Sequence, residues 1–273
     1  MLKPILKIFN GKAKKKRARV PDGERLYVIG DIHGRLDLFE ALVRAIEEDD
    51  KQSGAANTTI ILLGDLVDRG PQSAGVIQLA QLWEEYRDIR YLFGNHEEMF
   101  LDSFDDLEVM RHFLKHGGRE TILSYGVSEK EFNNSSTEEL QKLIKKKVPK
   151  SDRKFLKRFE DMIIIGDYVF VHAGINPNRS LDEQKPRELR WIRDKFLDHK
   201  DRHSHIVVHG HTITEEIEER KNRIGIDTGA YKFGTLTALV LEGDTRRYMQ
   251  AVAKKKKGGA KIVHLQAQDE GRT

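Results

Sequence analysis

The chain has 273 residues, a formal net charge of +4 and 38% hydrophobic residues, which is enough for a sizeable core in one large domain or two small ones. It has no cysteine, so disulfides, thiolate metal sites and a cysteine nucleophile are excluded. No stretch of the sequence is apolar enough for a transmembrane helix, and residues 1–10 do not resemble a secretory signal, so we expect a cytoplasmic location.

Basic side chains gather at the two ends of the chain, whereas the part between them has more acidic than basic groups. This pattern predicts a basic N-terminal arm at 1–22, one domain at 23–253 and a basic C-terminal tail at 254–273. Such charge runs are usually solvated and disordered. The functional alternative is a weak contact with a polyanion or with an anionic membrane surface. The oligomeric state is not predicted.

The first half alternates strands and helices. The apolar run at 26–29 predicts a buried strand, and 36–48 predicts an amphipathic helix. Further strands are expected at 58–63 and 89–93, with a helix at 73–86 between them. This alternation is typical of βαβ units and a mostly parallel sheet. In such a sheet, functional residues lie beyond the carboxyl ends of the strands.

The middle of the chain changes character. Residues 99–160 contain no predicted strand, and we interpret them as a helical insertion over the site, with helices at 107–116, 137–147 and 151–159. The second half is rich in strands. A hairpin is expected at 162–173 and a short helix at 189–197, followed by strands at 206–211, 223–227, 235–241 and 248–252. The pattern predicts an α/β fold.

Polar residues follow the predicted strands at the points where a parallel sheet collects its functional groups: Asp31, His33, Asp65, Asp68, Arg69, Asn95, His96, His172 and His211. Six of them are suitable ligands for two divalent ions, which usually share a bridging carboxylate. Asp65 is the natural bridge. Asp31 and His33 would complete one ion; Asn95, His172 and His211 would complete the other. Oxygen and imidazole ligands suit Mn, Fe or Zn, and we favour Mn.

Five motifs resemble the signature of the phosphoprotein phosphatase family within the calcineurin-like metallophosphoesterases. They are GDIHG (30–34), GDLVDRG (64–70), GNHE (94–97), HAG (172–174) and GHT (210–212). The resemblance covers about residues 25–240 and implies two facing mixed β-sheets flanked by helices. The C-terminal motifs of the eukaryotic enzymes are absent, so the chain is most similar to the short bacterial and lambda-phage serine/threonine protein phosphatases. Symmetrical dinucleoside tetraphosphate hydrolases share the five motifs.

The chemistry of the motif residues agrees with phosphoester hydrolysis. Two cations would lower the pKa of a shared water, and the resulting hydroxide would attack phosphorus in line. Arg69 would hold phosphoryl oxygens, because a guanidinium matches them in a bidentate fashion. His96 is the expected general acid and Asp68 its partner. The resemblance also implies a second phosphate-binding arginine, which we expect to be Arg193, with Arg190 as the alternative.

The leading hypothesis is therefore a metal-dependent protein phosphatase acting on phosphorylated proteins or peptides. A symmetrical dinucleoside tetraphosphate hydrolase is the alternative, and a non-catalytic metal-bearing binding protein is a remote one. Other polar residues are expected to be structural: Asp227 in a turn, His209 in packing, His112 and His116 at the surface or in packing, and His199, His203 and His205 in solvent.

Overall fold

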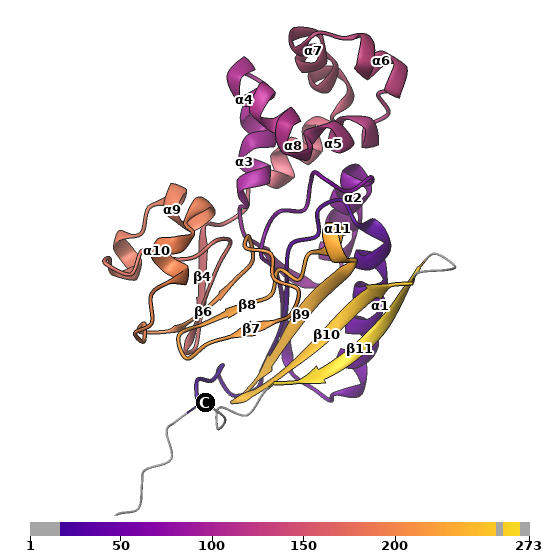
Figure 1. Ribbon diagram of the computed structural model, residues 1–273. Coiled ribbons are helices and arrows are strands. Elements are labelled where there is room, and N and C mark those ends of the chain that lie inside the picture. Colours follow the sequence, from indigo (N-terminus) through magenta and orange to yellow (C-terminus); the bar gives the residue numbers. More distant parts are fainter. Residues whose placement is uncertain (1–16, 255–258, 268–273) are drawn as a thin grey trace, which may run out of the picture.

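The computed structural model describes residues 17–254 and 259–267 and consists of two mixed β-sheets with helices on their outer faces (Figure 1). The six-stranded sheet has the order β11-β10-β9-β1-β2-β3, and the five-stranded sheet has the order β4-β5-β6-β8-β7. The expected α/β architecture of two facing sheets is confirmed.

The first sheet combines a parallel half with an antiparallel half. Its parallel strands are β1 (Glu24–Ile29), β2 (Asn57–Leu62) and β3 (Asp88–Tyr91). Its antiparallel strands are β9 (Thr235–Glu242), β10 (Thr245–Ala253) and β11 (Ala260–Gln266). The sheet is buried on both faces at β1, as the apolar runs predict: Leu26 and Val28 face the second sheet, whereas Tyr27 and Ile29 face the helices.

Helices α1 (Leu36–Gln52) and α2 (Ser73–Glu84) cover the outer face of this sheet. The apolar stripe of α1, which includes Leu38 and Leu42, belongs to the same buried cluster as Tyr27. The short helix α11 (Ala230–Phe233) precedes β9.

The second sheet contains β4 (Met162–Ile165), β5 (Tyr168–Val171), β6 (Ile206–His209), β7 (Glu218–Glu219) and β8 (Arg223–Gly225). Strands β5, β6 and β8 run parallel to one another. Their outer face is covered by a 3₁₀ turn (Leu181–Glu183) and by α9 (Pro186–Trp191) and α10 (Asp194–Leu197), through a small core around Phe196. The single helix expected at 189–197 is thus two helices, because Arg193 between them leaves the helical conformation, with φ −131° and ψ −109°.

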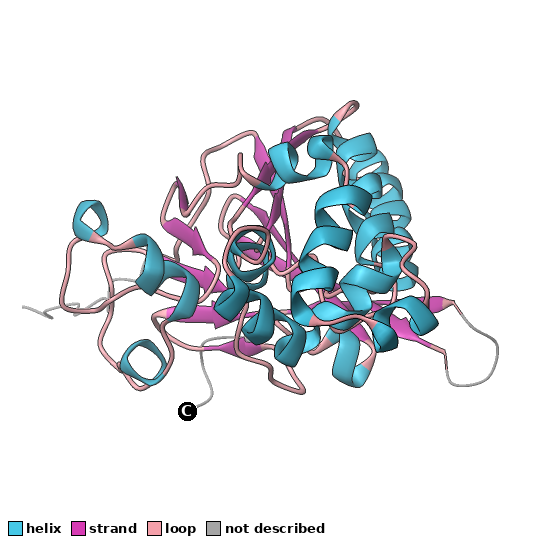
Figure 2. Cartoon of the chain, turned by 90° about the horizontal axis from the view of Figure 1, so that it is seen from above, coloured by secondary structure: helices cyan, strands magenta, loops and turns pink. Residues whose placement is uncertain are grey.

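The segment that connects β3 to β4 in the sequence is helical and lies above the strand ends in Figure 1. It contains α3 (Asn95–Asp102), α4 (Leu107–Phe113), a π-helical turn (Leu114–Gly118), α5 (Arg119–Ser124), α6 (Glu129–Asn134), α7 (Thr137–Lys147) and α8 (Lys150–Leu156). Seen from above, most helices lie on one side of the molecule (Figure 2).

The ends of the chain join the fold more closely than their charge suggests. The prediction of a tail at 254–273 is wrong for residues 260–266, which form the edge strand β11 against β10. The sequence of β11, AKIVHLQ, contains β-branched residues of strand character that the neighbouring lysines obscure. Within the predicted arm, Val20 is fully buried and its N–H donates to the carbonyl of Gly243 at 3.0 Å. Residues 1–16, 255–258 and 268–273 of the predicted basic ends lie outside the described residues.

Across the described ranges, no helix has both the length and the apolar character needed to span a bilayer.

Candidate active site

The carboxyl ends of five strands from both sheets bring the predicted ligands together. Asp31 and His33 follow β1, Asp65 follows β2, and Asn95 begins α3 just after β3; His172 follows β5 and His211 follows β6. Each of these six side chains is at most 6% exposed. Because polar groups are rarely buried without partners, this burial indicates that the six side chains interact with one another or with a bound ligand.

The backbone at this edge is strained. Five residues other than glycine have positive φ in the described part of the chain: His33, Asp65, Asp68, Arg69 and His211, with φ between 47° and 72°. All five belong to the motifs that the sequence singled out. Such conformations cost free energy and persist where the surrounding structure enforces them, typically at functional sites.

Two glycines of the motifs allow this crowding. A Cβ atom at Gly94 would overlap the Asp65 carboxylate, and a Cβ atom at Gly210 would overlap the carboxylate of Asp31. Any side chain at these positions would therefore push a carboxylate out of the site.

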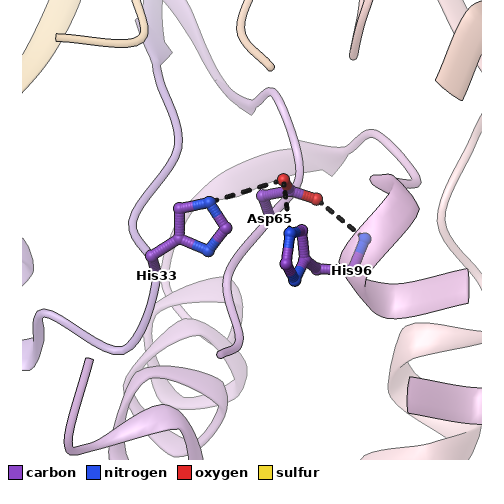
Figure 3. Close-up of side chains that lie close together, drawn as sticks. All are labelled: His33, Asp65 and His96. Atoms are coloured by element: carbon purple, nitrogen blue, oxygen red, sulfur yellow. Dashed lines mark hydrogen bonds and ion pairs between the residues drawn. The ribbon is translucent and has the colours of Figure 1, made fainter. Parts of the chain in front are cut away.

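Asp65 lies at the centre of two groups of possible metal ligands. The ligand atoms of His33, Asp65 and His96 lie within 4.8 Å of one another, and so do those of Asp65, His172 and His211. Asp65 Oδ2 is 3.5 Å from His33 Nε2 and 3.9 Å from His96 Nε2 (Figure 3). Its other oxygen, Oδ1, is 3.4 Å from His172 Nε2. One carboxylate thus presents an oxygen to each group, as a bridging ligand must.

Asn95 joins the second group. Its Oδ1 lies 2.9 Å from His172 Nε2 and 2.8 Å from His211 Nδ1. The remaining predicted ligand, Asp31, is outside both groups; its carboxylate accepts the backbone N–H of His211 at 3.0 Å. His96, expected as an acid and not as a ligand, is the member that completes the first group.

The chemistry of these residues fits divalent metal ions. Burial lowers the pKa of His33, of His172 and of His211, the last to about 2, so the three imidazoles are neutral and have lone pairs to offer. His33 Nδ1 lies 2.8 Å from the carbonyl of Val67, and His172 Nδ1 lies 2.7 Å from the carbonyl of Leu63; these carbonyls accept the ring N–H and leave Nε2 for an ion. His211 Nε2 is buried without a hydrogen-bond partner.

His96 and Asp68 form a buried pair beside Asp65. His96 Nδ1 lies 2.6 Å from Asp68 Oδ2. Burial lowers the pKa of His96, but the charges of Asp65 and Asp68 outweigh it, and the net pKa is above the ordinary histidine value. Asp68 also accepts a hydrogen bond from the hydroxyl of Thr121 at 2.6 Å. Thr121 lies on α5, so the helical segment supplies a supporting residue that the sequence pattern did not reveal.

Arg69 faces the same place. Its Nη1 is 2.9 Å from His33 Nε2, and its Nη2 is 2.9 Å from His96 Nε2. The guanidinium lies 4.7 Å from the ring centroid of Tyr231. The backbone N–H of Arg69 donates to the carbonyl of Gly117 in the π-helical turn. Tyr231 was not singled out from the sequence, because the residues around it, GAYKFG, contain no pattern beyond a turn.

The two candidate second arginines have different surroundings. The guanidinium of Arg190 donates hydrogen bonds to the carboxylates of Glu98 and Asp161 at 2.7 Å each, and it lies over the ring of Phe93. Arg193 is exposed, and its guanidinium has no ion-pair partner within the residues that the structure describes. Burial is the main cause of the low pKa values of His172 and His211, and the charge of Arg193 lowers both further, so Arg193 acts electrostatically on the second ligand group.

The remaining histidines lie apart from the ligand groups. His209 is buried, with its ring against Phe196 and Nδ1 3.0 Å from the carbonyl of Gly210, which is a packing role. The expectation that His203 is solvated is wrong: its ring stacks between His199 and Phe196, and burial lowers its pKa to about 4. The rings of His112 and His116 contact each other at a tilt of 35°, and His112 Nδ1 lies 3.1 Å from the sulfur of Met99.

Comparisons with known proteins agree with this site. Residues 24–236, more than half of the chain, match the calcineurin-like phosphoesterase family. The chain is 26% identical over 235 residues to the asymmetrical bis(5'-nucleosyl)-tetraphosphatase PrpE of Anoxybacillus flavithermus, covering 78% of this chain and 88% of that protein. It is 26% identical over 224 residues to serine/threonine-protein phosphatase 2 of Escherichia coli, covering 78% of this chain and 90% of that protein.

A solved structure provisionally described as a diadenosine tetraphosphatase has the same fold, with a TM-score of 0.57 and 21% identity over 93% of this chain and 100% of that chain. The relatives thus include both substrate classes. The chain belongs to the calcineurin-like phosphoesterase family, whose members are metal-dependent phosphoester hydrolases.

Proposed function

We propose that this phosphoesterase is a dinuclear metal-dependent phosphomonoesterase that acts on phosphoserine and phosphothreonine in proteins. The observation that carries the proposal is the buried His96–Asp68 pair at 2.6 Å, directly beside the shared carboxylate Asp65. Such a pair is a proton donor held in a fixed orientation.

The residues that would hold the ions follow from the sequence prediction and, except for Asp31, from the geometry. His33 and Asp65, with Asp31 as the predicted third ligand, would hold one ion, and Asp65, Asn95, His172 and His211 the other, with Mn as our preferred metal and Fe or Zn as the alternatives. When bound, the pair of ions would supply Lewis acidity and a water of lowered pKa.

The protein groups around this centre have separate tasks. Arg69, placed between His33 and His96, binds phosphoryl oxygens, and its contact with Tyr231 fixes its direction. Arg193 adds a second positive charge on the side of His172. His96 gives its proton to the leaving oxygen, while Asp68 and Thr121 keep its ring in place.

The acid pair favours a phosphomonoester over a phosphoanhydride. The alkoxide of serine or threonine is a strong base and leaves only when it is protonated, whereas a nucleotide polyphosphate is a much better leaving group. A buried acid whose pKa is raised by two carboxylates therefore accelerates the hydrolysis of an alkyl phosphate more than that of a phosphoanhydride.

A dinucleoside tetraphosphate is the second candidate substrate. It is favoured by the similarity to the PrpE protein, which extends over 78% of this chain. Under either proposal, the cytoplasmic location and a polyanion contact of the basic ends stay predictions.

One comparison separates the two candidates. We would measure kcat/KM on a phosphothreonine peptide and on diadenosine tetraphosphate, using the same enzyme preparation with Mn²⁺ added in both assays. The proposal expects the larger value for the peptide. A larger value for the tetraphosphate would replace it with the second candidate, and no turnover of either would favour a metal-bearing binding protein.

A further inference from the structure

A sixth strand end reaches the metal centre and carries a carboxylate with no role in the mechanism above. Strand β8 runs parallel to β6, and His209 pairs with Gly225 in their register. Two residues after β8 comes Asp227, which therefore lies at the same edge as His211. The segment that follows β8 also lies against the residue that follows β1, since a Cβ atom at Gly30 would lie 3.6 Å from the amide nitrogen of Asp227.

The side chain of Asp227 is buried and half satisfied. It is 2% exposed; Oδ1 accepts the N–H of Gly229 at 3.0 Å, whereas Oδ2 is buried and receives no N–H or hydroxyl donor, and the carboxyl group lies in hydrogen-bonding contact with that of Asp31. A buried carboxylate oxygen without a partner carries a large desolvation penalty, so it marks a place where a cation or a hydrogen-bond donor belongs.

The second oxygen of Asp227 belongs to the region of the predicted ligands. The backbone carbonyl of Asp227 accepts the N–H of Thr214 at 3.0 Å, three residues after the predicted ligand His211, and its carboxyl group contacts that of Asp31. Burial raises the pKa of Asp227 to about 6, and the charges of Asp65 and Arg69 also act on it. Asp31, Asp65 and Asp227 thus form a set of three buried carboxyls with Arg69 as the nearby cation.

We propose that Asp227 is a positioning residue of the metal centre, whose carboxylate strengthens the binding of a divalent transition-metal ion at the site that Asp31 completes. Its negative charge would lower the energy of an ion there, and its carboxyl group, in contact with that of Asp31, would fix the Asp31 side of the site. Two divalent ions bring four positive charges, and a third carboxylate balances them better than Asp31 and Asp65 alone.

The competing explanation is a turn residue that only accepts the N–H of Gly229. The two explanations differ in the substitution Asp227→Asn, because an asparagine Oδ1 can still accept that N–H while the charge is lost. A turn role predicts no change in metal affinity. A role in the metal centre predicts weaker binding of one ion by about 10–100-fold, the usual effect of losing a supporting partner around a metal.

The experiment titrates the full-length protein, freed of metal by chelation, with Mn²⁺ and separately with Zn²⁺ in a calorimeter. Asp244→Asn is the matched control, because Asp244 is an exposed aspartate in the turn between β9 and β10, at the other end of β1 from Asp31. We expect two ions per chain in all three proteins and a weakened affinity for one ion in Asp227→Asn alone. Isotherms equal to those of the wild type would overturn the proposal.

Thermal unfolding in the presence of EDTA gives a second readout. Asparagine keeps an acceptor for the Gly229 N–H, so the melting temperature in EDTA should stay equal while metal affinity falls. A variant that loses cooperative unfolding would instead show that the carboxylate is needed by the fold, and would also overturn the proposal. The inference rests on the metal centre and not on the substrate: a chain that binds both ions but hydrolyses no phosphopeptide would refute only the proposed function.

Discussion

Replacing His96 by asparagine tests the acid pair most directly. The His96 ring is held at Nδ1 by Asp68 at 2.6 Å and lies against Arg69 at Nε2. Because the proton donor is already oriented, its removal should cost the full effect of a general acid, about 10²–10⁴ in kcat on an alkyl phosphate. This loss corresponds to about 3–5 kcal/mol in the activation barrier.

The assay compares two leaving groups at one pH. A phosphoserine peptide needs its leaving oxygen protonated, whereas p-nitrophenyl phosphate releases a stable anion and should lose much less activity. Metal content is measured on the same samples, because the ring nitrogen of His96 is only 3.9 Å from Asp65 Oδ2 and could serve as a ligand. Equal loss on both substrates, or the loss of one bound ion, would refute the acid role.

Four other substitutions test separate parts of the site. Asn95→Ala should lower metal content from two ions to one per chain by elemental analysis, because its Oδ1 lies within 2.9 Å of His172 Nε2 and close to His211; two ions retained would remove it from the ligand set. In Asp68→Asn, the decline of kcat at high pH on an alkyl phosphate should begin at a lower pH. His96 works as an acid only while it is protonated, and its raised pKa depends partly on the Asp68 carboxylate. An unchanged pH profile would contradict this. Arg193→Ala should raise KM for a phosphopeptide about tenfold with little change in melting temperature. Arg190→Ala should instead lower the stability of the fold by about 2 kcal/mol, because it loses bonds to two carboxylates; the opposite pattern would exchange their roles.

Much of the site follows from the sequence because its residues sit at strand ends. A buried strand, a glycine and a polar residue are neighbours in the chain, so Asp31, Asp65 and Asn95 can be assigned to one edge without coordinates. His172 and His211 follow from the same rule in the second sheet. The two sheets themselves were expected from the family resemblance and not from the strand pattern.

Other parts of the site could not be read from the chain. Thr121 reaches Asp68 from a helix 53 residues away, and no local pattern marks that contact. Asp227 ends the predicted strand 223–227, but its neighbours in GIDTGA favoured a structural turn role. Strand β11 was hidden for a different reason, since the lysines beside it dominate the composition of the C-terminal segment.

The position of Asp65 between the sheets has a consequence for unfolding. The second ligand group takes Asp65 and Asn95 from the first sheet and His172 and His211 from the second. An ion held there is a cross-link between the two layers, whereas an ion beside His33 and His96 touches residues that follow strands of the first sheet alone. The two ions therefore differ in the structural elements that they connect. Each ion adds about 2.7 kcal/mol to the free energy of unfolding at a metal concentration 100-fold above its Kd. The ion of the second group should couple the two sheets into one cooperative unit, so that its removal lets the β4-to-β8 layer exchange its amide hydrogens before the β1-to-β3 layer does.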